Sequence, residues 1–236
     1  MDRKLVAALV GEGFGTFLFV FIGAGSIVLG GVLGSPSSLV AVALAHGIAL
    51  AVVVTAFAAV SGGHINPAVT VAIWISGGIE AVTGVLYVVA QLLGAAVAGF
   101  LLRAVFAESA WQPSILGIPA MMSGIDPTTG LVLEIVMTMV LVIAVFGTAV
   151  DPRAPRLGGL LIGLSITADI FVGGPITGAA MNPARWFGPA VATGDYTDWW
   201  VWVVGPIVGG AIVALLYRFV FAPRQVLVSA EETVPR

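Results

Sequence analysis

The stretch from Gly173 to Ala190, GGPITGAAMNPARWFGPA, constrains the fold more than any other because it places Asn-Pro-Ala and an arginine between two long apolar segments. Asn182 is a favoured helix N-cap residue and Pro183 suits a first helical position, so a helix is predicted to start at Asn182. The preceding glycines permit irregular backbone, which survives at membrane depth only where protein or a water-filled cavity satisfies its polar groups. The loop is therefore predicted to line a wet space.

The same sequence device occurs a second time, as SGGHINPAVT from Ser61 to Thr70, with Asn66 in the place of Asn182. A further match pairs the segment around Glu12 with the segment around Glu134. Because each copy contains an odd number of spans, the second copy must enter the membrane inverted. We therefore expect one channel domain, 1–236, with repeat one at about 5–104, repeat two at about 130–221 and a polar tail at 223–236.

The composition is that of an integral membrane protein, with 59% hydrophobic and 9% charged residues and a mean hydropathy of +1.12. Apolar runs near the roughly 20 residues that a spanning helix needs predict an all-α fold with six spans, the fifth of them short. Two half-helices, too short to span, follow the Asn-Pro-Ala boxes. The spans are expected at 5–33, 40–60, 82–104, 130–150, 157–173 and 199–221, and the half-helices at about 67–77 and 183–191.

The distribution of basic residues predicts the orientation, because cytoplasmic loops carry an excess of Lys and Arg. Only Arg103 falls on the opposite side from the others, so both termini are predicted to be cytoplasmic, in the plasma membrane or inner membrane of the cell. The residues on the common side are Arg3, Lys4, Arg153, Arg156, Arg218, Arg224 and Arg236.

The sequence also argues against several other classes of function. It contains no cysteine and only two histidines, which leaves little material for a metal site. It has neither a Gly-x-Ser-x-Gly elbow nor a His-Glu-x-x-His motif, so we expect no enzyme, no cofactor and no metal. The net charge of -3 carries no basic excess for nucleic acid.

The paired boxes, the glutamates early in spans one and four and the arginine after the second box together resemble the aquaporin, or major intrinsic protein, family. The resemblance implies an aquaporin-like right-handed bundle with two re-entrant half-helices, one pore per subunit and usually a homotetramer in the bilayer. It further implies passive conduction of water and, in some members, of glycerol, urea, ammonia or hydrogen peroxide. The boxes are Asn66, Pro67 and Ala68, and Asn182, Pro183 and Ala184.

The half-helices, asparagines and loop carbonyls together determine the electrostatics of such a pore centre. Two facing half-helix N-termini bring positive dipole ends to the centre, which repel cations and protons, and the asparagine amides offer donors to water. The loop carbonyls supply acceptors along an otherwise apolar wall. These carbonyls belong to Gly62, Gly63, His64 and Ile65 in the first loop and to Gly178, Ala179, Ala180 and Met181 in the second.

The resemblance places the selectivity filter at His46, Ile170, Ala179 and Arg185. This set is similar to that of plant tonoplast intrinsic proteins, which often pass ammonia or urea with water. Trp186 follows the arginine where glycerol facilitators usually carry Asp, which argues against a glycerol facilitator. The loop at about 105–129 contains no histidine, so a filter extended by a loop histidine is not available.

Several of these residues have alternative roles. Arg185 could be anchored to loop carbonyls for structure alone, and His46 could be a packed helix histidine. We interpret His64 mainly as loop scaffolding, with a pore gate as the alternative.

A carboxylate within an apolar span is costly unless it is hydrogen-bonded inside the bundle, so Glu12 and Glu134 are each expected to fix the backbone of the loop opposite. Proton coupling is their alternative role. Asp169, beside Ile170, is expected to hold the outer loop. The two alternatives for the whole protein are a strictly water-selective channel and an ion- or proton-coupled transporter using Glu12, Glu134 or Asp169.

Overall fold

The computed structural model describes residues 2–155 and 157–221, and within those ranges all regular secondary structure is helical. Six segments are long and apolar enough to cross a membrane, namely α1, α2, α4, α6 with η2, α7, and α9 with η3. The predicted all-α fold, with six membrane-length helices plus short helices, is confirmed. The elements are α1 (Arg3–Leu33), α2 (Leu39–Ser61), α3 (Pro67–Ser76), α4 (Ala81–Val105), α5 (Glu108–Trp111), η1 (Gln112–Gly117), α6 (Pro127–Val145), η2 (Phe146–Val150), α7 (Gly158–Thr177), α8 (Pro183–Thr193), α9 (Trp199–Leu216) and η3 (Tyr217–Phe221).

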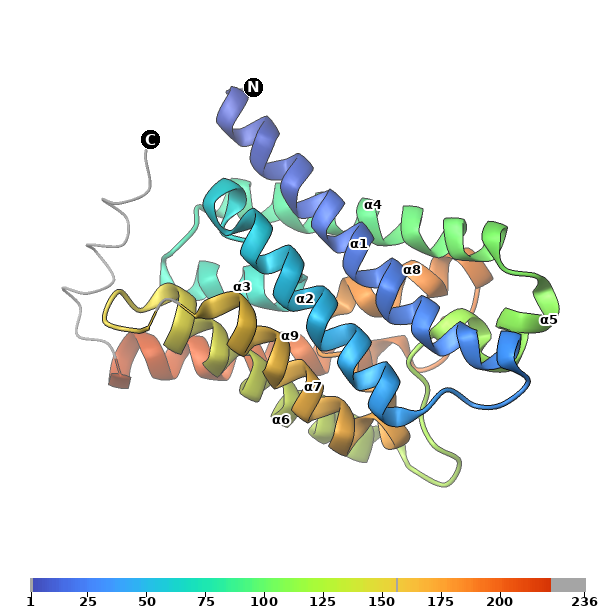
Figure 1. The fold of residues 1–236 in the computed structure, drawn as a ribbon. Coiled ribbons are helices and arrows are strands. Elements are labelled where there is room, and N and C mark those ends of the chain that lie inside the picture. The colour runs from blue at the N-terminus through green and yellow to red at the C-terminus, as the bar shows by residue number, and fades with distance from the viewer. Residues whose placement is uncertain (1, 156, 222–236) are drawn as a thin grey trace.

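The packing of the first half of the chain is repeated in the second half (Figure 1). α1 packs against α2 and α4 as α6 packs against α7 and α9, and α2 and α7 contact each other where the halves meet. The short helices α3 and α8 lie toward opposite ends of the bundle. Each packs against the last long helix of the other half, α3 on α9 and α8 on α4. The start of α1 and the end of α9 lie at the same end of the bundle.

Both half-helices begin as the sequence predicts, at an asparagine cap followed by proline. Asn66 Oδ1 accepts a hydrogen bond from Ala68 N at 2.8 Å, and Asn182 Oδ1 accepts one from Ala184 N at 3.0 Å. These bonds satisfy backbone donors that the first turn of a helix leaves unpaired. Each half-helix ends at a left-handed glycine, Gly77 after α3 and Gly194 after α8.

The fifth span is longer than expected, because α7 continues through Gly173, Gly174 and Pro175 to Thr177. We expected irregular backbone from Gly173, on the view that the glycines break the helix. In the structure Gly173 instead lets α7 pack closely against α6, since a Cβ at this position would lie 2.2 Å from the sulfur of Met137. Pro175 lies in the last turn and removes only one helix hydrogen bond. The irregular loop is therefore confined to Gly178–Met181, between α7 and α8.

The loop at 105–129 contains the short helices α5 and η1, which pack on the end of α1. The predicted tail at 223–236, together with Arg156, lies outside the described residues.

Candidate functional site

Glu12 organises the first irregular loop from within α1. Its Oε1 accepts hydrogen bonds from Ser61 Oγ at 2.6 Å and from the backbone N–H of His64 at 2.9 Å. Its Oε2 accepts from the Ile65 N–H at 2.7 Å and from Gln91 Nε2 at 2.7 Å. The side chain is fully buried. A buried carboxylate with four donors holds the loop backbone that would otherwise be unpaired at membrane depth.

Glu134 performs the same task for the second loop from within α6. Its Oε1 accepts from Thr177 Oγ1 at 2.7 Å and from the Ala180 N–H at 3.0 Å, and its Oε2 accepts from the Met181 N–H at 2.8 Å. The expectation that each glutamate fixes the loop opposite is therefore wrong: Glu12 binds residues 61–65 and Glu134 binds residues 177–181, each in its own half of the chain. Each carboxylate accepts hydrogen bonds from two backbone N–H groups of its loop, so both loops are held by buried glutamates inside the bundle.

These contacts hold the two loops in a backbone conformation that side chains disfavour. Ile65, Ala179 and Met181 have positive φ values of 54°, 45° and 50°. Left-handed backbone costs an L-residue roughly 1–2 kcal/mol. The N–H groups of Ile65 and Met181 are held by the glutamates, which stabilises this conformation.

The two asparagines join the loops to each other. Asn66 Nδ2 donates to the carbonyl of Met181 at 2.9 Å, and Asn182 Nδ2 donates to the carbonyl of Ile65 at 3.0 Å. The N-termini of α3 and α8 therefore meet in the interior, as the sequence predicts. The carbonyls of Ile65 and Met181, two of the expected pore acceptors, thus each accept from the asparagine of the other loop.

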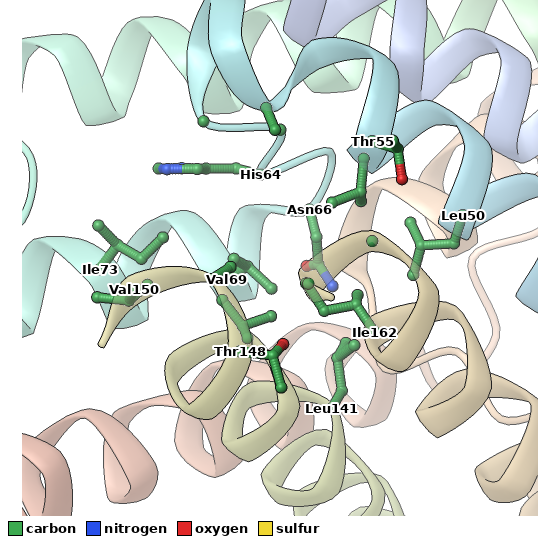
Figure 2. A pocket seen from close by; sticks show the side chains of 18 of the residues that line it. Leu50, Thr55, His64, Asn66, Val69, Ile73, Leu141, Thr148, Val150 and Ile162 are labelled. Carbon is green, nitrogen blue, oxygen red and sulfur yellow. The ribbon is translucent and has the colours of Figure 1, made fainter. Parts of the chain in front are cut away.

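A cavity of about 810 Å³ extends from the asparagines to the loop that follows α6. Figure 2 shows the side chain of Asn66 pointing into this cavity and the ring of His64 projecting from the loop at its edge. Gly62 and Gly63 also line it, so part of the expected row of carbonyl positions borders this space. The remaining wall is mainly apolar and includes Leu50, Val54, Val69, Ile73, Leu141, Ile162 and Ile166.

A second cavity of about 670 Å³ lies at the other end of α2 and α7 and is lined by His46, Ile170 and Gly178. Leu50 and His46 are one turn apart in α2, as are Ile166 and Ile170 in α7. One turn rises roughly 5–6 Å, so only that length of helix separates the linings of the two cavities. The two spaces therefore approach each other from opposite ends of the bundle.

His46 and Ile170, both expected in a filter, thus border the same cavity, and His46 is held by one contact to its own helix. Its Nδ1 lies 2.8 Å from the Val42 carbonyl, which can only accept, so Nδ1 carries a proton. Its ring packs at the edge of Phe19, and a Cβ at Gly23 would lie 2.6 Å from Nε2. Within the described residues Nε2 has no hydrogen-bond partner.

Arg185 is buried at the start of α8, with 1% of its surface exposed. Its Nη1 donates to the carbonyl of Gly117 at 2.7 Å, whereas Nε and Nη2 have no partner among the described residues. Buried guanidinium donors without protein partners are costly unless water reaches them. The carbonyl anchor considered from the sequence is therefore present, and two further buried donors of the guanidinium have no partner among the described residues. Ala179 is buried in the adjoining loop and does not border either cavity described above.

Two further buried polar residues, His64 and Asp169, differ in whether their side chains have partners in the described structure. His64 Nδ1 lies 3.1 Å from Thr70 Oγ1, and its ring packs against Tyr87, which fits the expected scaffolding role. Asp169 is buried but, contrary to expectation, makes no described hydrogen bond to the outer loop, and its Oδ2 has no partner in the described structure. It is one of the buried residues of α7.

Sequence reasoning missed Gly117, whose carbonyl holds Arg185. This carbonyl is presented by three successive residues with positive φ, Ile115, Leu116 and Gly117. Leu116 is fully buried against α1 and α4, which fixes the turn. The glycine was the only local signal, because isoleucine and leucine rarely adopt left-handed backbone.

Comparison with known proteins agrees with this geometry. The family model described as major intrinsic protein matches residues 2–217. The chain is 45% identical to a probable aquaporin TIP2-2 from Oryza sativa subsp. japonica, over 91% of this chain and 87% of the relative. It is 46% identical to aquaporin TIP2-3 from Zea mays, over 94% and 90%.

The fold is also similar to a solved structure, the aquaglyceroporin from Plasmodium falciparum, with a TM-score of 0.80 and 24% sequence identity over 93% of this chain and 98% of that one. The match with the family model spans nearly the whole chain and includes both half-helices and both glutamates. The chain is therefore a multi-pass integral membrane protein that belongs to the major intrinsic protein family, the family of the aquaporin channels.

Proposed function

We propose that this protein is a passive transmembrane channel for water that also admits small neutral solutes, ammonia and urea first, with hydrogen peroxide and glycerol as further candidates. One observation carries the proposal: two cavities approach from opposite ends of the bundle and are separated by a single turn of α2 and α7. The asparagine pair belongs to the lining of one, and His46 and Ile170 to the lining of the other. Arg185 borders neither cavity, but its two buried donors without a partner among the described residues favour water beside them.

The same arrangement supports exclusion of protons and ions. The N-termini of α3 and α8 meet through the Asn66 and Asn182 contacts, so their positive dipole ends act on the same point. Arg185 adds a buried positive charge nearby. A neutral molecule does not experience this barrier, whereas a cation does.

A proton-coupled transporter receives less support from the contacts. Glu12 and Glu134 are occupied by four and three hydrogen-bond donors, among them two loop N–H groups each. Protonation would turn one accepting oxygen into a donor facing other donors. This arrangement suits a permanent structural acceptor better than a group that exchanges protons during transport.

The identity of residue 170 is expected to set the solute range. Ile170 presents an apolar side chain to the cavity at one of the four expected filter positions, so solutes that lose part of their hydration pass more easily. Substituting Ile170→His fills that wall with a polar ring. We expect ammonia or urea flux to fall at least several-fold more than water flux, in stopped-flow measurements on proteoliposomes at matched protein density.

Ile170→Val, which keeps the apolar wall, serves as the matched control and should preserve the flux ratio. Equal loss of water and solute flux in Ile170→His, or no solute flux through the wild type, would contradict the proposed solute range. The second of these results favours the strictly water-selective channel instead.

We further propose that both termini are cytoplasmic, that the channel resides in the plasma membrane or inner membrane of the cell, and that four copies assemble. The first of these is supported by the start of α1 and the end of α9 lying at the same end of the bundle. Arg3 is the first residue of α1, Arg218 lies in η3 after α9, and Arg153 bonds the carbonyl of Phe221 at the end of η3. Protease protection of an N-terminal tag in sealed vesicles tests the orientation, and native mass spectrometry tests the assembly.

A further inference from the structure

Two arginines occupy equivalent positions at the outer ends of the half-helices. Arg103, in the last turn of α4, donates from Nη1 to the carbonyl of Ala192 in α8. Arg218, in η3, donates from Nη1 to the carbonyl of Ile75 in α3 at 2.6 Å. Each of these carbonyls belongs to the second residue before the glycine that ends its half-helix. The two hydrogen bonds are therefore equivalent, and each joins an arginine of one half of the chain to a half-helix of the other half.

The rest of each helix end is also equivalent and is satisfied locally. Ser76 Oγ donates back to the Ile73 carbonyl at 2.8 Å, and Thr193 Oγ1 donates back to the Pro189 carbonyl at 3.0 Å. The closing glycine of each helix donates its N–H to a carbonyl of the last turn. The half-helices carry no basic residue of their own in that turn. Among the described residues, the arginine that bonds each helix end comes from a helix in the other half of the chain.

Each guanidinium is also supported by an aromatic ring. Arg103 lies over the Trp111 ring with its Cζ 5.6 Å from the centroid, and Arg218 lies over the Phe219 ring at 5.5 Å. Stacking of this kind favours the cation and restricts its orientation. The same combination of carbonyl contact and aromatic support at both ends argues against two chance surface contacts.

A charge at the C-terminus of α3 or α8 affects the pore centre because the N-terminus of the same half-helix lies there. An α-helix carries about half a positive charge at its N-terminus and about half a negative charge at its C-terminus. The N-termini of α3 and α8 meet at the asparagine pair, and their C-termini weaken the positive potential there. A cation bound at the C-terminus offsets that negative end.

We propose that Arg103 and Arg218 are positioning charges that strengthen the electrostatic barrier to protons and cations from the outer ends of the half-helices. The inference rests on the proposed channel function and goes beyond it by naming two residues outside the pore. Half-helices of 10 and 11 residues place the guanidinium groups roughly 15 Å from the pore centre. At that distance, with an effective dielectric between that of a protein surface and that of water, each charge changes cation passage about two- to six-fold.

The test measures proton flux in an Arg185→Val background, because removing the buried guanidinium lowers the main barrier and makes smaller contributions visible. Arg103→Gln and Arg218→Gln are added to this background separately and together, beside Arg103→Lys and Arg218→Lys. Arg153→Gln is the matched control, since the described hydrogen bonds of the Arg153 side chain go to Asp151 and the Phe221 carbonyl and not to a half-helix end. A pH-sensitive dye in proteoliposomes reports proton flux, and water permeability of the same vesicles reports the amount of functional protein.

We expect each Gln variant to raise the ratio of proton flux to water flux about two- to six-fold, while the Lys variants and Arg153→Gln stay at the level of the background. Because both arginines are exposed, the difference should shrink when an impermeant salt raises the ionic strength from about 0.01 to 1 M. A loss of packing alone would not depend on salt and would not be rescued by lysine.

An unchanged ratio in the Gln variants, an equal rise in the Gln and Lys variants, or a rise independent of salt would overturn the inference. So would a triple variant lacking all three guanidinium groups that conducts water yet passes no more protons than wild type. If one arginine variant fails to fold, the other decides, because the proposal requires the same effect from both. A folded wild type without water permeability would instead overturn the proposed function itself.

Discussion

Replacing Glu12 with alanine is expected to abolish the folded protein. The substitution removes the acceptor for four donors, two of which are backbone N–H groups of the loop that leads into α3. A buried donor left without a partner costs about 1–3 kcal/mol, so the sum reaches roughly 5 kcal/mol or more, comparable with the whole stability of an ordinary protein. Size-exclusion chromatography in detergent and thermal unfolding are the measurements.

Glu12→Gln separates the loss of hydrogen bonds from the loss of volume. Glutamine keeps one oxygen acceptor but turns an N–H₂ group toward existing donors, so an intermediate loss is expected. Glu80→Ala is the control, because Glu80 is exposed and its side chain makes no capping hydrogen bond at the start of α4. A monodisperse Glu12→Ala protein with the thermal midpoint of wild type would show that the glutamate does not hold the loop.

Replacing Gly99 with alanine is expected to have the second largest effect. A Cβ at this position would lie 2.1 Å from the Gly188 carbonyl oxygen and 2.5 Å from the carbonyl carbon. Both are backbone atoms, so α4 and α8 must separate. Overpacking of this kind costs typically 1–3 kcal/mol and occasionally more. Because α8 also carries Arg185, we expect a lower thermal midpoint together with reduced water permeability per folded molecule.

The matched control for Gly99→Ala is Gly84→Ala, in the same helix. A Cβ at Gly84 would meet only side-chain atoms of Ile79 and Thr70, both at the ordinary contact distance of 3.8 Å. Alanine is the better helix former by about 0.5–1 kcal/mol, so this variant should be neutral or slightly more stable. If Gly99→Ala and Gly84→Ala behave alike, the close approach of α4 and α8 does not govern stability.

The positions of the helices were largely predictable because each sequence signal for a helix indicated only one structure. Long apolar runs bounded by polar residues gave the six spans to within a few residues, and the Asn-Pro pair gave the starts of α3 and α8. The end of α7 was not predictable. Gly173 and Gly174 serve in the structure to bring the helix close to a neighbour, and the sequence does not separate that use of glycine from chain breaking.

The candidate site was predictable only where its residues carry unusual chemistry for a membrane. A carboxylate inside an apolar span required donors, which identified Glu12 and Glu134, and a buried arginine required an acceptor. The sequence could not name that acceptor, since the Gly117 carbonyl depends on left-handed backbone at Ile115 and Leu116. The contacts of Arg103 and Arg218 were hidden for a related reason: each bonds a backbone carbonyl far along the chain, and every residue has a carbonyl.

The central claim, that the bundle encloses a passive pore for neutral molecules, is tested most directly by stopped-flow light scattering of proteoliposomes under an osmotic gradient, with current recorded from the same protein in planar bilayers. The account predicts that the folded wild-type protein raises water permeability well above that of protein-free vesicles and carries no proton or cation current under a voltage step. Water permeability equal to that of empty vesicles, or a reproducible proton current that accompanies solute uptake, would contradict it.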